Sequence, residues 1–329
     1  MQQSAKELKV TVFLRIHDRS NFYKEALNSI LEQDCPRDAI RLVVLTNLED
    51  VAEYFRNFAD IDNSVYYYQT GSEGEVLYRG IESSSGPILC FLDDDDLWAK
   101  ERVSVILEAF KNNPKLGYFH NSVEPFSDDS VKVQRKIYER KSNSDLLYVD
   151  NVDKHRMIRK ITEYYPDFNL SSICILRDVV VKHLDDLPRV STSPDTFFYF
   201  CALDSAFDLL LDSRALTLYR HHSKILSTSN ARNSKWNVDV FESHQTLLNV
   251  FSGGGPLLKN IAVRRYVLTK IQISLISLDI PRKTRIKYFI EYLRIFLYFL
   301  IPVDFLVLSL CALSIFDKGL GKRIYHNFM

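Results

Sequence analysis

The sequence has 329 residues, of which 46% are hydrophobic and 26% are charged, and its formal net charge is zero. That length favours one large domain with a smaller appendage over two equal domains. The balanced charge, without a tract dense in Lys or Arg, argues against nucleic acid as the main partner. The five cysteines are scattered singly, and the N-terminal MQQSAKELKV contains no apolar signal segment. We therefore expect reduced thiols and a cytoplasmic protein.

Strands and helices are predicted to alternate through the first third of the chain. Short apolar runs predict strands at residues 8–16, 40–45, 64–69, 87–92 and 116–120. Apolar residues at helical spacing predict helices at residues 22–33, 50–58, 75–83 and 100–112. This order is typical of βαβ units with right-handed crossovers and predicts an α/β fold.

Four consecutive aspartates, at positions 93–96, directly follow the apolar run at 87–92. An unbroken apolar run is typical of a strand buried on both faces, and ligands of such sheets bind beyond the carboxyl ends of the strands. Four adjacent carboxylates repel one another unless a cation or water screens them. Mg²⁺ and Mn²⁺ prefer carboxylate oxygens and often bridge to phosphates. The alternative is a solvated acidic loop that caps the following helix.

The middle of the chain is less regular. Residues 123–167 are charged, and we expect a hairpin or helical insertion there that lies over the substrate. A strand is then predicted at 169–176, a helix at 178–183, an apolar helix at 195–211 that contains Asp204 and Asp208, and a strand at 216–220 that leads into His221 and His222.

The C-terminal third is predicted to be helical, with helices at 235–251 and 257–278 before an apolar tract at 288–316. Its last 22 residues, 295–316, are long enough to cross a bilayer, but Pro302 and Asp304 fall in the middle. Basic residues flank the tract on both sides, which also fits two short helices lying in the membrane interface. We expect association with the cytoplasmic face of a membrane, in plane or spanning. The alternative is a homodimer formed through this tail.

Three segments of the chain resemble family-2 glycosyltransferases of the GT-A fold. They are VTVFLRIHDRSNFYKEALNSILEQ near the N-terminus, GEVLYRGIESSSGPILCFLDDDDLWAKERV with an Asp-x-Asp metal motif, and CALDSAFDLLLDSRALTLYRHHSKILS with a Tyr-Arg-His-His ending. The resemblance covers about residues 10–229. It implies a Rossmann-like mixed sheet flanked by helices, which we expect over residues 1–230. The helical pattern described above predicts a C-terminal helical, apolar extension over residues 231–329.

The resemblance also implies a nucleotide-sugar donor and a divalent metal ion, Mn²⁺ or Mg²⁺. By its motifs, Asp95 is a metal ligand, with Asp94 and Asp96 as alternatives in register. His222, rather than His221, is expected to complete the metal site or to contact the diphosphate. Asp204 is the base that takes the proton of the acceptor hydroxyl in an inverting reaction, with Asp208 as a competitor. The residues expected at the donor are Arg15, His17, Thr46, Asn47, Arg79, Asp93 and Asp94.

Other side chains have weaker assignments. Arg19 is expected near the donor phosphates, and Arg220 is expected either to contact phosphate or to form a structural ion pair. Trp98 is expected to pack under the metal loop. The chain differs from the usual Pro-Thr-Tyr-Asn of the family at Arg15-Ile16-His17-Asp18, and has Leu45-Thr46-Asn47 where the family usually carries acidic residues.

Together these features predict transfer of a sugar to a hydroxyl acceptor on a glycan or a lipid-linked glycan. One alternative is sugar transfer to a polyprenyl phosphate, whose acceptor oxygen is already anionic. The other is a degenerate, non-catalytic fold that only binds glycans or acts as a scaffold.

Overall fold

The computed structural model describes residues 8–17, 22–127, 145–221, 234–276, 280–299 and 302–317. The chain divides into two compact units, Met1–Ile225 and Leu226–Met329. Each unit is described here by itself. We propose that they correspond to the domains expected over residues 1–230 and 231–329.

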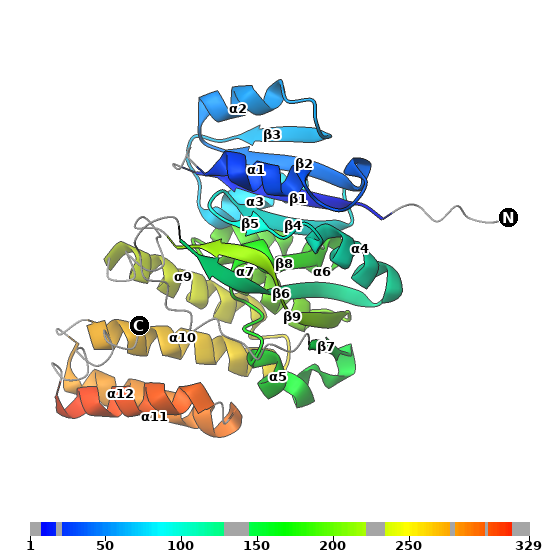
Figure 1. Ribbon diagram of the computed structural model, residues 1–329. Coiled ribbons are helices and arrows are strands. Elements are labelled where there is room, and N and C mark those ends of the chain that lie inside the picture. Colours follow the sequence, from blue (N-terminus) through cyan, green and yellow to red (C-terminus); the bar gives the residue numbers. More distant parts are fainter. Residues whose placement is uncertain are drawn as a thin grey trace. The chain divides into compact units, whose positions relative to one another are not determined.

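The first unit is built on one mixed sheet with the strand order β3-β2-β1-β4-β8-β6-β9-β5, and β7 also pairs with β9 (Figure 1). Strand β1 (Val10–Ile16) pairs in parallel with β2 (Ile40–Thr46) on one side and with β4 (Ile88–Asp93) on the other. Strand β3 (Asn63–Tyr67) pairs in parallel with β2. The other strands are β5 (Leu97–Trp98), β6 (Leu116–Phe126), β7 (Leu146–Val149), β8 (Ile173–Leu176) and β9 (Asp208–Arg220). The prediction of a mixed α/β sheet flanked by helices is confirmed.

Strand directions define two edges of this sheet. Strands β1, β2 and β4 have their carboxyl ends on the same side of the sheet. We call this line of strand ends the carboxyl edge. Strand β8 runs antiparallel to β4 and to β6, and β9 runs parallel to β6. Therefore β6 and β9 also end at the carboxyl edge, and β9 starts at the opposite, amino edge.

The helices of this unit are α1 (Tyr23–Leu31), α2 (Glu49–Arg56), α3 (Glu73–Glu82), α4 (Arg102–Asn112), α5 (Lys154–Thr162), α6 (Arg177–Val181) and α7 (Pro194–Asp204). Short 3-10 helices are η1 (Arg37–Ala39), η3 (Asn151–Asp153), η4 (Leu170–Ser172) and η5 (Leu184–Arg189). Helix α3 begins where the Ser72 hydroxyl accepts a hydrogen bond from the Glu75 amide at 3.1 Å, a side-chain N-cap.

Strand β4 is buried on both faces, as its unbroken apolar sequence predicts. Every residue of β4 from Ile88 to Leu92 has zero exposure. On one face Phe91 stacks against Phe13 of β1 and Phe198 of α7, with ring centroids 5.5 and 4.7 Å apart. The packing fixes the end of β4, and with it the position of the aspartates that follow.

The apolar stretch predicted as one helix over 195–211 is instead a helix followed by a strand. Helix α7 ends at Asp204, and β9 begins at Asp208 and pairs with both β6 and β7. An apolar run without a clear period is compatible with either structure, and here the strand pairing decides. In the expected insertion, β6 continues to Phe126 and β7, η3 and α5 follow from residue 146; residues 128–144 lie outside the described part of the chain.

The second unit contains four helices in its described residues: α9 (Ser234–Phe251), α10 (Pro256–Ile276), α11 (Arg282–Phe299) and α12 (Pro302–Phe316). Buried polar contacts join them, including His244 of α9 to Thr269 of α10 and the Arg285 guanidinium of α11 to the Ser314 carbonyl of α12. Among the described helices, none combines the length and apolarity that a membrane span needs.

Candidate functional site

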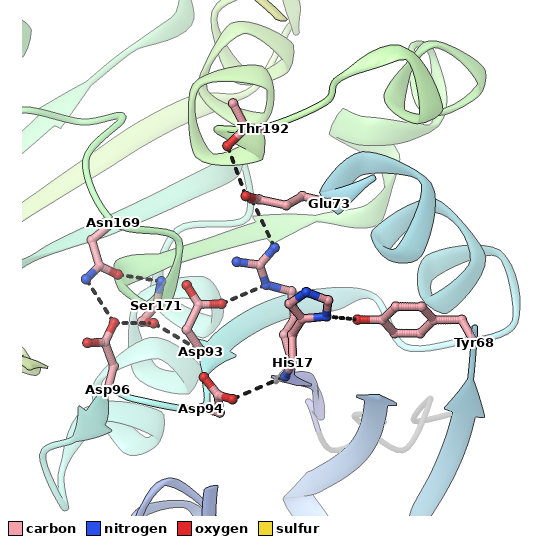
Figure 2. A network of polar contacts seen from close by, with 10 residues as sticks. His17, Tyr68, Glu73, Asp93, Asp94, Asp96, Asn169, Ser171 and Thr192 are labelled. Carbon is pink, nitrogen blue, oxygen red and sulfur yellow. Dashed lines mark hydrogen bonds and ion pairs between the residues drawn. The ribbon is translucent and has the colours of Figure 1, made fainter. Parts of the chain in front are cut away.

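The aspartates at 93–96 emerge at the carboxyl edge, where β1 lies beside β4 with Arg15 opposite Asp93. The Arg15 Nε donates to Asp93 Oδ1 at 2.7 Å, and its Nη1 donates to Glu73 Oε2 at 3.2 Å (Figure 2). Burial opposes a charge on Arg15, but Asp93 and Glu73 together raise its pKa above the ordinary value. The Arg15 guanidinium is therefore a fixed cation between two carboxylates.

Glu73 carries this network on toward helix α7. Its Oε1 accepts a hydrogen bond from the Thr192 hydroxyl at 2.9 Å, two residues before α7 begins. The close approach of α3 to this segment depends on Gly74, since an added Cβ would lie 2.1 Å from the Leu187 carbonyl oxygen. The ends of β1 and β4 and the starts of α3 and α7 thus meet at one place.

Asp96 is the buried anchor of the aspartate tract. Its side chain accepts hydrogen bonds from Asn169 Nδ2 at 3.0 Å, Ser171 Oγ at 2.7 Å and the Arg220 backbone N–H at 3.1 Å. Burial first, and then the charges of Asp95 and Asp93, raise the pKa of Asp96 well above its ordinary value, although the bonds from Ser171 and Asn169 oppose this. Burial and the neighbouring carboxylates therefore disfavour a negative charge on Asp96 itself.

Ser171 and Trp98 hold the aspartate tract through further hydrogen bonds. The Ser171 hydroxyl also accepts the Asp93 backbone N–H at 3.1 Å, and its carbonyl accepts the Trp98 indole N–H at 2.9 Å. The guanidinium of Arg102 lies 4.2 Å from the Trp98 ring centroid. Trp98, 3% exposed, is packed under the loop. Sequence reasoning missed Ser171 and Asn169, because their contacts join segments more than 70 residues apart.

Arg220, at the end of β9, forms hydrogen bonds and an ion pair with other residues of the first unit. Its Nε donates to the Asp95 carbonyl oxygen at 2.9 Å, and its Nη2 pairs with Glu25 at 2.6 Å. The guanidinium lies 4.5 Å from the ring centroids of both Phe22 and Phe126, and the side chain is 1% exposed. Of the two expected roles, this geometry fits a structural ion pair that holds the aspartate loop.

Aromatic rings line the neighbouring part of the carboxyl edge. The His17 backbone N–H donates to Asp94 Oδ2 at 3.2 Å, and the Tyr68 hydroxyl lies 3.4 Å from His17 Nδ1, with the two rings nearly parallel (Figure 2). Tyr68 in turn stacks on Tyr66, with centroids 6.3 Å apart. Tyr68 was not among the expected site residues, although the sequence SVYYYQ places Tyr66 and Tyr68 on one face of a strand.

The remaining expected donor residues fall in two places. Thr46 ends β2 at the carboxyl edge and is buried, with its hydroxyl accepting the Leu48 backbone N–H at 3.1 Å; Asn47 follows it and is half-buried. Arg79 instead lies six residues along α3 from Glu73, about 9 Å at the helical rise of 1.5 Å per residue. There it pairs with Glu82 at 3.3 Å and is half exposed. The described contacts of Arg79 do not connect it to the aspartate tract.

The structure does not bring Asp204 to the aspartate tract. Asp204 is the last residue of α7, whose first turn lies by the Glu73 network, so about 15 Å of helix separates it from that end. Its carboxylate accepts hydrogen bonds from the Lys182 ammonium and, at 2.7 Å, from His183 Nε2. Asp204 is therefore a half-buried ion-pair partner toward the amino edge, away from the aspartate tract at which the base is expected.

Asp208 also lies at the amino edge, because it begins β9 opposite Leu116 at the start of β6. Its two carboxylate oxygens accept the Tyr148 hydroxyl at 2.6 Å and the Asn151 backbone N–H at 2.7 Å. Those bonds fix the turn after β7. The carboxylate of α7 on the side of the network is Asp195, in the first turn of the helix. The signal for it in the sequence is Ser193-Pro194-Asp195, a typical helix start.

Two expected residues, Arg19 and His222, lie outside the described residues. His221, the last described residue of that segment, is buried. Within the part of the chain that the structure describes, no group of three or more His, Cys, Asp or Glu side chains is arranged to hold a metal ion.

The model of the family described as glycosyl transferase family 2 matches residues 11–182, which is more than half of the chain. The chain belongs to glycosyl transferase family 2. This match begins at the second residue of β1 and contains β2 to β4, the aspartate tract and β8, and so covers most of the carboxyl edge. The prediction of a family-2 glycosyltransferase domain is confirmed.

Curated relatives of this family-2 chain are also named as glycosyltransferases. An uncharacterized glycosyltransferase of Rickettsia bellii is 25% identical over 130 residues, 39% of this chain and 19% of the relative. Another, from Nostoc sp., is 23% identical over 147 residues, 43% of this chain and 45% of the relative. The match thus spans about a fifth of the length of the Rickettsia protein.

Among solved structures, residues 1–349 of S. aureus TarS in complex with UDP-GlcNAc resemble this family-2 chain. The TM-score is 0.60 at 13% identity, and the alignment covers 98% of this chain and 93% of the TarS chain. At that identity the likeness supports the GT-A fold alone.

Proposed function

We propose that the chain transfers a sugar, with inversion, from a nucleotide-sugar donor to a hydroxyl group on a glycan or a lipid-linked glycan. The observation that carries this proposal is the family-2 match over residues 11–182 together with the aspartate tract at the end of β4. In α/β sheets, ligands bind beyond the carboxyl ends of the strands, which is where the tract, the aromatic rings and the first turn of α7 lie.

The donor would lie across the ends of β1, β2 and β4. His17 and Tyr68 offer nearly parallel ring faces for the nucleotide base, and Thr46, followed by Asn47, ends the strand between them. The diphosphate would then reach toward the tract that begins at Asp93. Arg15 supports this arrangement by holding Asp93, rather than by reaching the phosphates itself.

The donor set at the tract fits a divalent cation, Mn²⁺ or Mg²⁺. By its place in the Asp-x-Asp motif that the chain shares with its family, Asp95 is the carboxylate we assign to the metal, with Asp94 beside it. One or two carboxylates suffice when substrate phosphates supply further ligands, as is usual for Mg²⁺. When bound, the ion would neutralise the negative charge of the departing diphosphate.

The inverting reaction needs a base that takes the proton of the acceptor hydroxyl, and we assign this role to Asp195. It lies in the first turn of α7, three residues after Thr192, which is tied to Glu73 and through it to Arg15 and Asp93. As the acceptor oxygen forms its bond to the anomeric carbon, its proton would pass to the Asp195 carboxylate, and the bond between that carbon and the diphosphate would break, releasing the nucleoside diphosphate.

The test compares Asp195→Asn with Asp204→Asn in a transfer assay with a panel of nucleotide sugars, beginning with UDP-GlcNAc. Loss of a general base lowers turnover by about 10²–10⁴-fold, so Asp195→Asn should lose kcat while still binding the donor. Asp204→Asn should keep its activity and lose about 2 kcal/mol of stability, since Lys182 and His183 lose their partner. An active Asp195→Asn would overturn the assignment.

Asp195→Asn and the wild type separate the two alternatives. If the natural acceptor is a polyprenyl phosphate, its oxygen is already ionised, and Asp195→Asn should transfer sugar to a phosphate acceptor as fast as the wild type does. If the fold is a non-catalytic scaffold, no nucleotide sugar of the panel should raise the thermal stability of the wild type in the presence of Mn²⁺.

A further inference from the structure

Helix α11 of the second unit exposes a narrow apolar stripe. Ile286, Ile290 and Leu297 are 39%, 45% and 63% exposed. They follow one another at i, i+4 and i+11, which places them within about 40° of one another around the helix. Single exposed apolar residues are ordinary, but three on one stripe of one helix suggest a partner.

A basic stripe runs beside the apolar one. Lys283, Lys287 and Arg294 repeat the same i, i+4, i+11 spacing three residues earlier, and all three are exposed. The one acidic residue of α11 is Glu291, whose contact with Lys287 is 3.9 Å long and whose side chain is 31% exposed. A surface pair of that length neutralises little of the positive charge.

The stripe continues onto the end of α12. Phe316, the last residue of α12, is 82% exposed, and the Arg282 guanidinium lies 5.8 Å from its ring centroid. An exposed aromatic ring beside an exposed cation extends the mixed apolar and basic face past the start of α11. We call the residues Arg282, Lys283, Ile286, Lys287, Ile290, Arg294, Leu297 and Phe316 the α11 face.

The other side of α11 already has its packing partners, so the α11 face is not an unfinished core contact. Arg285 is 1% exposed and donates to the Ser314 carbonyl of α12 at 2.8 Å. Tyr292 is fully buried, and Glu291 lies 3.8 Å from Lys270 of α10. The helix is thus held by its opposite side while the α11 face remains exposed.

We propose that the α11 face binds in the plane of an anionic lipid surface. A strip of apolar side chains flanked by Lys and Arg is the pattern of interfacial helices, where the apolar residues enter the acyl boundary and the cations meet lipid phosphates. Pairing with a second copy through this face would set its four cations against the same four cations. Charge complementarity therefore favours anionic lipid over self-association.

The proposal is tested by co-sedimentation of the full chain with vesicles of phosphatidylcholine, with and without phosphatidylglycerol. Two double variants remove the two stripes separately: Ile290→Ser with Leu297→Ser, and Lys283→Gln with Arg294→Gln. The matched control is Lys111→Gln with Lys115→Gln, which removes two exposed lysines of the first unit. Circular dichroism checks that each variant remains folded.

We expect the wild type and the control to sediment with anionic vesicles and not with neutral ones. Each basic residue near an anionic membrane contributes about fivefold to binding, so losing two should weaken it by about 25-fold. The apolar variant should also lose binding. Equal sedimentation of all four proteins would overturn the proposal. So would a dimeric wild type, by analytical ultracentrifugation, that becomes monomeric in the two α11 variants without any change in vesicle binding.

Discussion

Arg15 shows how one side chain organises this site. It lies between Asp93 and Glu73, and it connects the end of β4 to the start of α3 and, through Thr192, to α7. The guanidinium can bond to two carboxylates at once, which an ammonium group on a flexible stem does less well. The family usually has Pro-Thr-Tyr-Asn where this chain has Arg15-Ile16-His17-Asp18. The ion pairs of Arg15 are therefore a departure from the usual family motif.

Arg15→Met should destabilise the first unit by about 2 kcal/mol, because Asp93 and Glu73 would face each other without a cation. Equilibrium unfolding in urea measures this loss. Arg56→Met is the matched control, since Arg56 and Glu49 form an exposed pair at 3.2 Å that should contribute less than about 0.5 kcal/mol. An equal, small effect of both substitutions would contradict the role assigned to Arg15.

At the scale of elements, what could be predicted depended on how local the signal is. The aspartate tract follows an unbroken apolar strand, and both were evident from the sequence alone. Asp195 and Asp204 share one apolar stretch, and choosing between them required knowing where α7 begins and β9 starts. The strand pairing of β9 with β6 and β7 decides that boundary, and such long-range pairing leaves no local pattern.

The contact between α9 and α10 makes the second unit sensitive to acid. Burial lowers the pKa of His244 to about 3, and its Nδ1 lies 2.6 Å from the Thr269 hydroxyl. Because the folded pKa is below the unfolded value, the unfolded state binds the extra proton. Stability is therefore complete above about pH 6.5 and is lost as the pH falls toward 3.

We expect the wild type to lose about 2 kcal/mol between pH 6.5 and pH 5 relative to His244→Gln, whose neutral amide does not titrate. Urea unfolding of both proteins, followed by circular dichroism at the two pH values, gives the difference. Parallel stability curves for the two proteins would show that His244 carries no such penalty.

For the whole molecule, the sequence supported the order of strands and helices, the family and the carboxyl edge as the site. It could not supply the contacts that hold the aspartate loop, since Asn169, Ser171 and Arg220 reach Asp96 from distant segments. Nor could it supply the exposure of the α11 face, because the same apolar residues are compatible with a span, a core or a surface. Whether such a residue is buried or exposed depends on which side of its helix packs against neighbouring helices.

The account depends most on a divalent cation acting with Asp95 at the donor site. Isothermal titration calorimetry of a panel of nucleotide sugars, with and without Mn²⁺, tests this on the wild type and on Asp95→Ala. One donor should bind the wild type with an affinity that Mn²⁺ raises by about tenfold or more, and folded Asp95→Ala should lose that increase. Equal donor binding by both proteins in Mn²⁺ would contradict the account.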